Sequence, residues 1–326
     1  MGVAFMALAT TQTAQACASC GCSLSSDWEG PGVSGGTGFK LDIRYDYLNQ
    51  NQLRSGSGTI SSAAASQIVN GDDKQEVEKF TKNDYLTVSL DYAFNPVWGI
   101  NVQLPYIVRS HSTLGTASDG TTPGSDGGQY DSRTSSIGDV KVIGRYQGLL
   151  PTRNLSLLFG LKLATGSHTE TGTSTDPDVT DPAPIDRGLQ PGTGTTDVIV
   201  GASYVGLLSP DWSYMVQGLF QSALHSQDDY RPGNGLNLNA GLRYTALTSV
   251  QPQIQLNVRH VLRDTGANAD NVSTGGTLVY LSPGINVPLS KQASLYGYTQ
   301  IPISQHVNGV QLAPKFTASV GLHYAF

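Results

Sequence analysis

All three cysteines of the chain lie close together near the N-terminus, at Cys17, Cys20 and Cys22. Thiolates at this spacing could hold a soft metal ion such as Cu(I) or Zn(II), because these ions prefer sulfur ligands. No histidine follows Cys20, so the C-x-x-C-H pattern of haem attachment is absent. In an oxidising compartment the same residues could instead form one disulfide with one spare thiol, or engage a partner protein. The sequence leaves these alternatives open.

The residues around the cysteines predict export from the cytoplasm. Residues 3–9 are apolar, and Ala14-Gln15-Ala16 resembles a cleavage site just before Cys17. We therefore predict a signal peptide over residues 1–16, with a truncated n-region because the first charged residue is Asp27. Residues 17–38, rich in Ser and Gly, are predicted to form a flexible periplasmic leader. Acylation of Cys17 is a further alternative.

Two Ser/His combinations could in principle support hydrolysis. Ser167 precedes His168, and Ser304 lies two residues before His306. Neither pair has the surroundings of an activated serine, and adjacent side chains on a strand point to opposite faces. The sequence therefore predicts no catalytic residue and no enzyme. The loop acids between residues 176 and 186 lack the twelve-residue calcium-loop pattern, so we interpret them as turn formers.

The elements that carry the remaining polar residues show period-two alternation. From Phe39 onward, apolar residues at every second position are separated by polar ones, which predicts β-strands with two different faces. We expect twelve such strands, over residues 39–50, 82–94, 97–110, 137–148, 153–165, 196–207, 212–225, 235–247, 252–264, 275–287, 292–304 and 313–326.

The length and connections of these segments favour a transmembrane barrel. Strands in soluble proteins usually have about 5–6 residues, whereas a tilted strand that crosses a bilayer needs about 9–11. Short turns such as Asn95-Pro96 alternate with long polar tracts such as 166–195, as in outer-membrane barrels with short periplasmic turns and long external loops. We therefore predict an all-β, antiparallel, up-and-down barrel over residues 39–326. Within the first long tract, residues 72–82 are predicted to form a short helix.

Aromatic residues gather beside the predicted short turns and at the C-terminus, where a girdle at the membrane interface would need them. The chain ends in Tyr324-Ala325-Phe326, which resembles the C-terminal signature that barrel insertion machinery recognises. This pattern predicts outer-membrane lipid and the insertion machinery as partners. The aromatic residues are Tyr92, Phe94, Trp98, Tyr146, Tyr204, Trp212, Tyr214, Tyr244, Tyr324 and Phe326.

If the apolar series faces lipid, the polar series lines the interior. Outward Val102 and Leu256 then alternate with inward Gln103 and Asn257. The interior carries both signs of charge, which could give a weak preference for anionic or polar solutes, or could pair across strands and fill a narrow lumen. The candidate lumen-lining residues are Asp42, Arg44, Asp46, Arg109, Lys141, Arg145, Lys162, Arg243, Arg259 and Arg263.

Overall composition excludes several classes of function. Only 13% of the residues are charged, the formal net charge is -6, and no cluster of five Lys or Arg occurs, so nucleic acid is not a predicted partner. No apolar run approaches the roughly 20 residues of a transmembrane helix.

Three motifs make the prediction more specific. Ile137-Gly138-Asp139-Val140, Leu189-Gln190-Pro191-Gly192-Thr193-Gly194-Thr195-Thr196-Asp197 and Val307-Asn308-Gly309-Val310-Gln311-Leu312 resemble motifs of the barrel family named for the MetA pathway of phenol degradation. This resemblance implies an outer-membrane transporter and no catalytic residues. From the residues alone, Gly-Asp and Gly-Thr-Gly also fit a purely turn-shaping role.

Together these patterns predict a channel or uptake protein for small molecules, including aromatic or other small organic compounds, in the outer membrane of a Gram-negative bacterium. We expect a narrow or gated pore and no cofactor, apart from a soft metal ion at the leader. The alternative is a membrane-anchored periplasmic protein that binds metal or a redox partner through Cys17, Cys20 and Cys22.

Overall fold

The computed structural model describes residues 37–70, 73–74, 77–113, 129–174 and 182–326. Almost all regular structure in this part of the chain is β-strand. The helical elements there are one turn of α-helix, α1 (Ser62–Ala65), and one turn of 3₁₀ helix, η1 (Arg187–Leu189). Within the described ranges, no helix has the length and apolar character needed to span a membrane.

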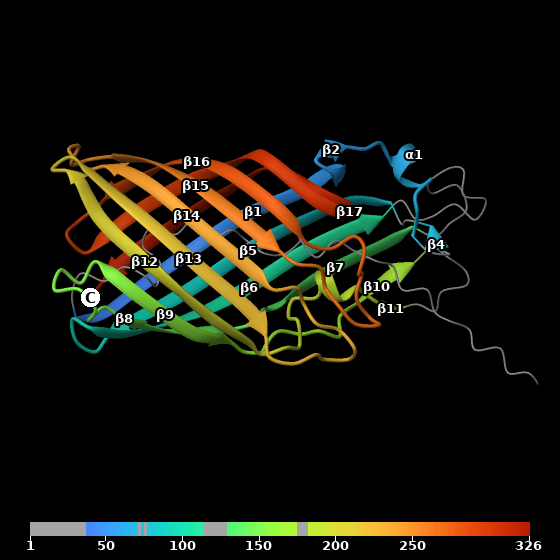
Figure 1. Ribbon diagram of the computed structural model, residues 1–326, viewed down its shortest axis with the longest axis horizontal. Helices are drawn as coiled ribbons and strands as arrows, with labels where there is room; N and C mark the ends of the chain where they lie inside the picture. The colour runs from blue at the N-terminus through green and yellow to red at the C-terminus, as the bar shows by residue number, and fades with distance from the viewer. Residues whose placement is uncertain (1–36, 71–72, 75–76, 114–128, 175–181) are drawn as a thin grey trace, which may run out of the picture.

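Eleven antiparallel strands form a closed ring (Figure 1). The ring closes because β8 pairs with β6 as well as β9, while the first strand pairs with the last. Its strands are β1 (Gly38–Gly56), β5 (Glu78–Ala93), β6 (Trp98–Thr113), β8 (Lys141–Tyr146), β9 (Leu155–Lys162), β12 (Asp197–Ser209), β13 (Trp212–Ala223), β14 (Gly235–Tyr244), β15 (Gln251–Val261), β16 (Gly276–Pro288) and β17 (Ala293–Ala325).

The last element, β17, folds back on itself. Its first half pairs with β16 and its second half with β1, and Val307 has a partner in both strands. The fold-back lies at Gly309, whose φ of 57° is in the left-handed region that favours glycine. The predicted number of about twelve strands is therefore close, because the last two predicted segments form this one element.

Several short strands lie outside the ring. β7 (Tyr130–Ile137) pairs with the C-terminal half of β6, and β8 pairs with the N-terminal half of β6. The wall therefore has a break between β7 and β8, at Gly138–Val140. β10 (Thr171–Ser174) and β11 (Ala183–Pro184) extend the sheet from β7. The remaining short strands are β2 (Gly58–Thr59), β3 (Val69–Asn70) and β4 (Asp73–Lys74).

The predicted helix over residues 72–82 is wrong for the described residues of this segment, while residues 72, 75 and 76 lie outside them. Asp73–Lys74 form β4. Residues 78–82 belong to β5, where they pair with β1 and β6. The spacing of Glu76 and Phe80 fits a helix, but in Glu78–Lys82 the pairing of the backbone with two neighbouring strands decides the structure.

The two ends of the ring differ in their connections. At one end, adjacent strands are joined by short turns such as Leu289–Gln292, and the C-terminus also lies there (Figure 1). The opposite end carries the long connections, including residues 262–275 and the connection from β9 to β12, of which the structure describes residues 163–174 and 182–196. We call this connection the 163–196 loop. We call the two ends of the ring the short-turn end and the long-loop end.

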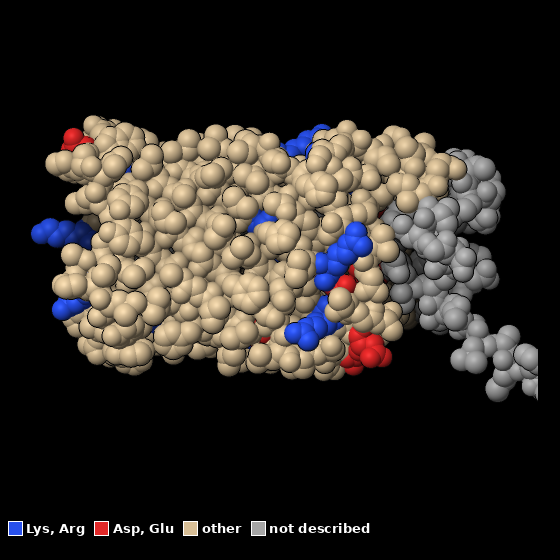
Figure 2. Space-filling model, viewed as in Figure 1, with Lys and Arg blue, Asp and Glu red and all other residues tan. Residues whose placement is uncertain are grey.

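The outer face of the ring is apolar. Most charged side chains on the face seen in Figure 2 lie near the two ends, and the broad band between them is largely uncharged. Large apolar residues that are exposed on successive strands include Leu86, Leu90, Val102, Leu104, Leu161, Val200, Val216, Leu238, Leu256, Ile285, Ile301 and Val320.

The predicted aromatic residues meet at the short-turn end. Ring centroids of Trp98 and Tyr146 are 4.7 Å apart, and those of Trp212 and Tyr244 are 5.0 Å apart. Tyr204 stacks on Tyr214, and at the C-terminus Tyr324 contacts Phe326 edge to face. Register explains these contacts, because Trp98 pairs with Tyr146 and Trp212 with Tyr244 across adjacent strands.

Candidate functional site

The strands present polar side chains to the interior of the ring, as their alternation requires. On β15, Leu256 is 41% exposed on the outer face, whereas its neighbour Asn257 is completely buried. Asn257 donates to Asn239 Oδ1 at 2.9 Å and accepts from Ser282 Oγ. The outward and inward faces thus follow the sequence pattern on this strand.

The structure places the candidate lumen-lining residues in three environments. Lys141 and Arg259 are half-buried, with Arg259 Nη1 donating to Asn237 Oδ1 at 3.1 Å. Arg263 lies beyond the end of β15 on an exposed loop, so it is not part of the strand wall. The buried members are Asp42, Arg44, Asp46, Arg109, Arg145, Lys162 and Arg243.

The buried carboxylates near the short-turn end hold specific partners. Arg145 on β8 donates both terminal nitrogens to Asp91 on β5, at 2.7 and 3.1 Å. Arg44 donates to Asp46 at 2.9 Å. Tyr296 OH contacts both carboxylate oxygens of Asp42, at 2.9 and 3.1 Å. A buried charge is stable only with such partners.

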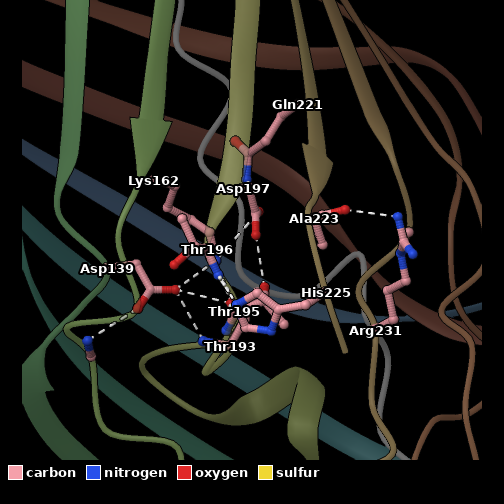
Figure 3. A network of polar contacts seen from close by, with 12 residues as sticks. Asp139, Lys162, Thr193, Thr195, Thr196, Asp197, Gln221, Ala223, His225 and Arg231 are labelled. Atoms are coloured by element: carbon pink, nitrogen blue, oxygen red, sulfur yellow. Dashed lines mark hydrogen bonds and ion pairs between the residues drawn. The ribbon is translucent and has the colours of Figure 1, made fainter. Parts of the chain in front are cut away.

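Near the long-loop end, Lys162 joins two carboxylates at the point where the wall divides (Figure 3). Lys162 Nζ lies 2.7 Å from Asp139 and 3.3 Å from Asp197, and all three side chains are buried. Asp139 also accepts the backbone N–H groups of Gly166 and Thr193, each at 3.0 Å. Asp139 and Lys162 therefore fix both ends of the 163–196 loop to the wall.

Close backbone contact reinforces this junction. A Cβ atom on Gly192 would lie 2.4 Å from the carbonyl oxygen of Gly166, and one on Gly166 would lie 2.9 Å from the carbonyl carbon of Gly138. Since these neighbours are backbone atoms, they cannot rotate away. Glycine at positions 166 and 192 lets the two ends of the loop pack against each other and against Gly138.

The same loop also contacts β6, on the other side of the break between β7 and β8, where Arg109 binds it. Arg109 Nη1 donates to the carbonyl oxygens of Gly188, Leu189 and Gln190, and Nε donates to Asn83 on β5. These carbonyls belong to the last two residues of η1 and to its C-cap residue, so the guanidinium satisfies groups that the short helix leaves unpaired. Arg109 thereby attaches residues 188–190 to the interior face of the wall.

Gln190 is a functional candidate that the sequence did not single out individually. Its amide donates to the carbonyls of Glu170 and Ile185 and accepts the Glu170 N–H, with all three distances between 2.9 and 3.0 Å. This side chain holds the loop in its folded shape. Its place within a motif was the available signal, but its partners lie 5 and 20 residues away and no spacing rule predicts them.

The first two sequence motifs meet at this junction, because Asp139 contacts Thr193 and Asp197 contacts Lys162. The third motif forms the fold-back of β17. There Asn308 donates to Thr274 O at 2.9 Å and Gln311 to Gly275 O at 2.8 Å. Its role in the structure is to shape this turn and attach it to the preceding loop.

Contacts at the long-loop end continue from loop to loop. Arg187 lies 5.2 Å from the Tyr230 ring and contacts Asp228 at 3.3 Å. Tyr230 OH donates to Asp264 at 3.0 Å, and the Gly233 N–H donates to the same carboxylate at 2.7 Å. Burial raises the pKa of Asp264 to about 6, although these two hydrogen bonds oppose the shift. The nearby charge of Asp270 raises it further.

The Ser/His combinations do not assemble a hydrolytic site. His168 faces Asp228 at 3.7 Å, and His306 Nδ1 lies 2.9 Å from Ser57 Oγ. Cys17, Cys20 and Cys22 lie outside the described residues, so their metal or redox role stays a prediction. Within the described ranges, no three His, Cys, Asp or Glu residues group in a way that could hold a metal ion.

Comparison with solved structures relates this architecture to known proteins. An outer membrane channel from Pseudomonas putida F1 superposes with a TM-score of 0.62, covering 92% of this chain and 99% of that chain at 13% sequence identity. The chain shares the fold of that channel. At this identity the likeness extends to the fold alone.

Weaker likenesses include the CymD monoaromatic hydrocarbon channel (TM-score 0.49, 11% identity, 90% of this chain and 89% of that chain). The toluene transporter TbuX of Ralstonia pickettii gives 0.44 at 11% identity, with 90% of each chain covered. No protein-family model and no curated protein sequence matches the chain. The resemblance to the phenol-degradation family therefore stays a prediction.

Proposed function

We propose that the protein is an outer-membrane channel that takes up small organic compounds into a Gram-negative cell. The observation that carries this proposal is the closed ring with an apolar outer face and a polar interior. A soluble monomer rarely exposes an apolar patch larger than a few hundred Å². A bilayer requires such a surface, and it also requires every backbone group of the wall to be paired.

The proposed orientation follows from the two ends. The short-turn end, with its aromatic residues, faces the periplasm, and the long-loop end faces the exterior. Phe326 at the short-turn end then presents the last strand to the insertion machinery. Aromatic compounds are a specific expectation that comes from the resemblance of the three motifs, and it belongs to this proposal.

The described parts of the 163–196 loop, residues 163–174 and 182–196, are proposed to restrict passage through the channel. The loop is held against the wall by Arg109 on β6, by Lys162 on β9 and by Asp139 in the break between β7 and β8. Because the loop is attached to side chains that face the interior, solute entry requires these contacts to yield. The channel in this conformation is therefore narrow and gated at its long-loop end.

Conductance of the purified protein in planar bilayers tests this proposal. In Lys162→Met, Asp139 and Asp197 lose their shared cation, which should destabilise the docked loop by about 3–5 kcal/mol. We expect a small ion current from the wild-type protein and a larger, noisier one from Lys162→Met.

Lys291→Met is the matched control, because Lys291 is exposed in the short turn between β16 and β17. It should conduct like the wild-type protein. Folded protein that conducts in none of the three forms would overturn the channel, and equal currents from all three would overturn the role of the loop.

A further inference from the structure

The interior wall formed by β13 to β16 carries a row of uncharged polar side chains. A chain of side-chain hydrogen bonds runs from Gln217 through Asn239 and Asn257 to Ser282, across β13 to β16. We propose that this wall contains a binding site for an uncharged solute that carries a hydroxyl or carbonyl group. The inference rests on the proposed channel function and specifies its class of solute.

Gln255 is the centre of the proposed site. Its side chain is 1% exposed, and neither Nε2 nor Oε1 has a hydrogen-bond partner. Ser282 pairs with Gln255 across the strands, but its hydroxyl group donates a hydrogen bond to Asn257 instead. A buried amide without partners is costly, so Gln255 has the capacity to donate to and accept from a solute.

Gln300 supplies a second donor on the same row. Leu281 pairs with Ile301 and Gly284 with Tyr298, which places Ser282 opposite Gln300. Gln300 Oε1 accepts from Thr317 at 2.8 Å, while its buried Nε2 has no partner. Gln255 and Gln300 lie two strands apart, or roughly 10 Å. A solute that pairs with both amides must therefore span this distance.

The surroundings of the two glutamines favour an apolar body on the solute. Tyr298 lies two residues from Gln300 on the same face of β17 and stacks on Tyr296, with ring centroids 6.4 Å apart. Tyr280 lies two residues from Ser282 and is also buried. Aromatic faces beside amide groups provide apolar contact together with orientation by hydrogen bonds.

Charge distribution argues against a cationic solute at this site. Asp42, Asp46 and Asp91 on the facing strands already accept from Tyr296, Arg44 and Arg145. On the amide side, Arg243 donates to Gln253 and Arg259 donates to Asn237, in other rows. A cation bound between Gln255 and Gln300 would be buried beside uncharged amides, with both guanidinium groups on the same wall, which is unfavourable.

Block of single-channel current tests the site directly. The probes are butane-1,4-diol, which is uncharged and has an apolar four-carbon body, and 4-hydroxybutylammonium, a cation of similar size. We expect butanediol to cause saturable interruptions of the current and the cation to cause none. Gln255→Leu should weaken the butanediol block by about tenfold, because it removes hydrogen bonds to a buried amide.

Two further variants keep the result interpretable. Gln300→Leu should weaken the block even if Gln255→Leu fails to fold. Gln292→Leu, which removes an exposed amide from a short turn, should leave the block unchanged. Equal block by 4-hydroxybutylammonium, or no effect of either interior substitution, would overturn the inference. Absence of current in every form would instead count against the channel itself.

Discussion

Buried charges in this protein occur where they attach one segment to another. Lys162 joins strand β9 to Asp139 and Asp197, and Arg145 joins β8 to β5. Replacing one partner of such a pair is more damaging than replacing both, because an uncompensated charge remains buried. The individual residue therefore determines which connection of the wall is weakened.

Asp264 gives a prediction at this scale, because its pKa of about 6 exceeds the ordinary value of 3.8. Well below pH 3.8 the carboxyl is protonated whether or not the loop is folded. As pH rises from 4 to 6, the unfolded loop ionises more readily, so the folded loop loses stability, on the order of 3 kcal/mol in total. Amide hydrogen exchange over residues 262–275, corrected for intrinsic rates, should be slower at pH 4 than at pH 7.5.

Asp264→Asn is the corresponding control. An amide oxygen can still accept the Gly233 N–H, and the side chain no longer titrates. The variant should show equal protection of this loop at both pH values. A pH difference that survives the substitution would assign it to another group, with Asp270 first, because burial raises its pKa as well.

Each strand of the ring has an apolar face on the outside and a polar face on the inside. Val102→Arg on β6 and Leu256→Arg on β15 would place a cation on the apolar face, at a cost of about 2–4 kcal/mol near the bilayer midplane. Both variants should show reduced assembly into the membrane fraction, measured by the yield of folded barrel.

Gln103→Arg is the matched control on β6, because Gln103 is half-buried on the interior face. It should assemble normally. The corresponding change at Asn257 is unsuitable, since that side chain is completely buried and bonded on two sides. If Val102→Arg assembled as well as Gln103→Arg, the assignment of the two faces would be wrong.

Sequence alternation predicts the strands well wherever one face of the strand is apolar and the other is polar. It misses β7, because Tyr130–Ile137 carries polar residues at both alternating positions and resembles a loop. It also extends this strand to residue 264, and so places Arg263 in the wall, although β15 ends at Val261. The junction of the 163–196 loop depends on contacts between residues up to 81 positions apart, such as Arg109 and Gln190. Local pattern contains no information about such contacts.

Closure of the ring predicts the behaviour of the whole molecule. A barrel whose strands are all paired leaves no edge for detergent to open, so it resists unfolding until it is heated. The protein should migrate faster on a denaturing gel before boiling than after. Identical mobility under both conditions, combined with recovery in a soluble fraction, would contradict the membrane barrel.

The seam between β1 and β17 joins the beginning of the ring to its end. Its register runs from Lys40 opposite Ala325 to Gly56 opposite Val307, and Tyr296 contacts Asp42 across 254 positions of sequence. Contacts between residues so far apart in the sequence form late, because the chain between them must first be organised. Until the last strand arrives, the growing sheet has two unpaired edges that can join other chains. This protein is therefore expected to assemble slowly and to need protection from aggregation until β17 pairs with β1 and closes the ring.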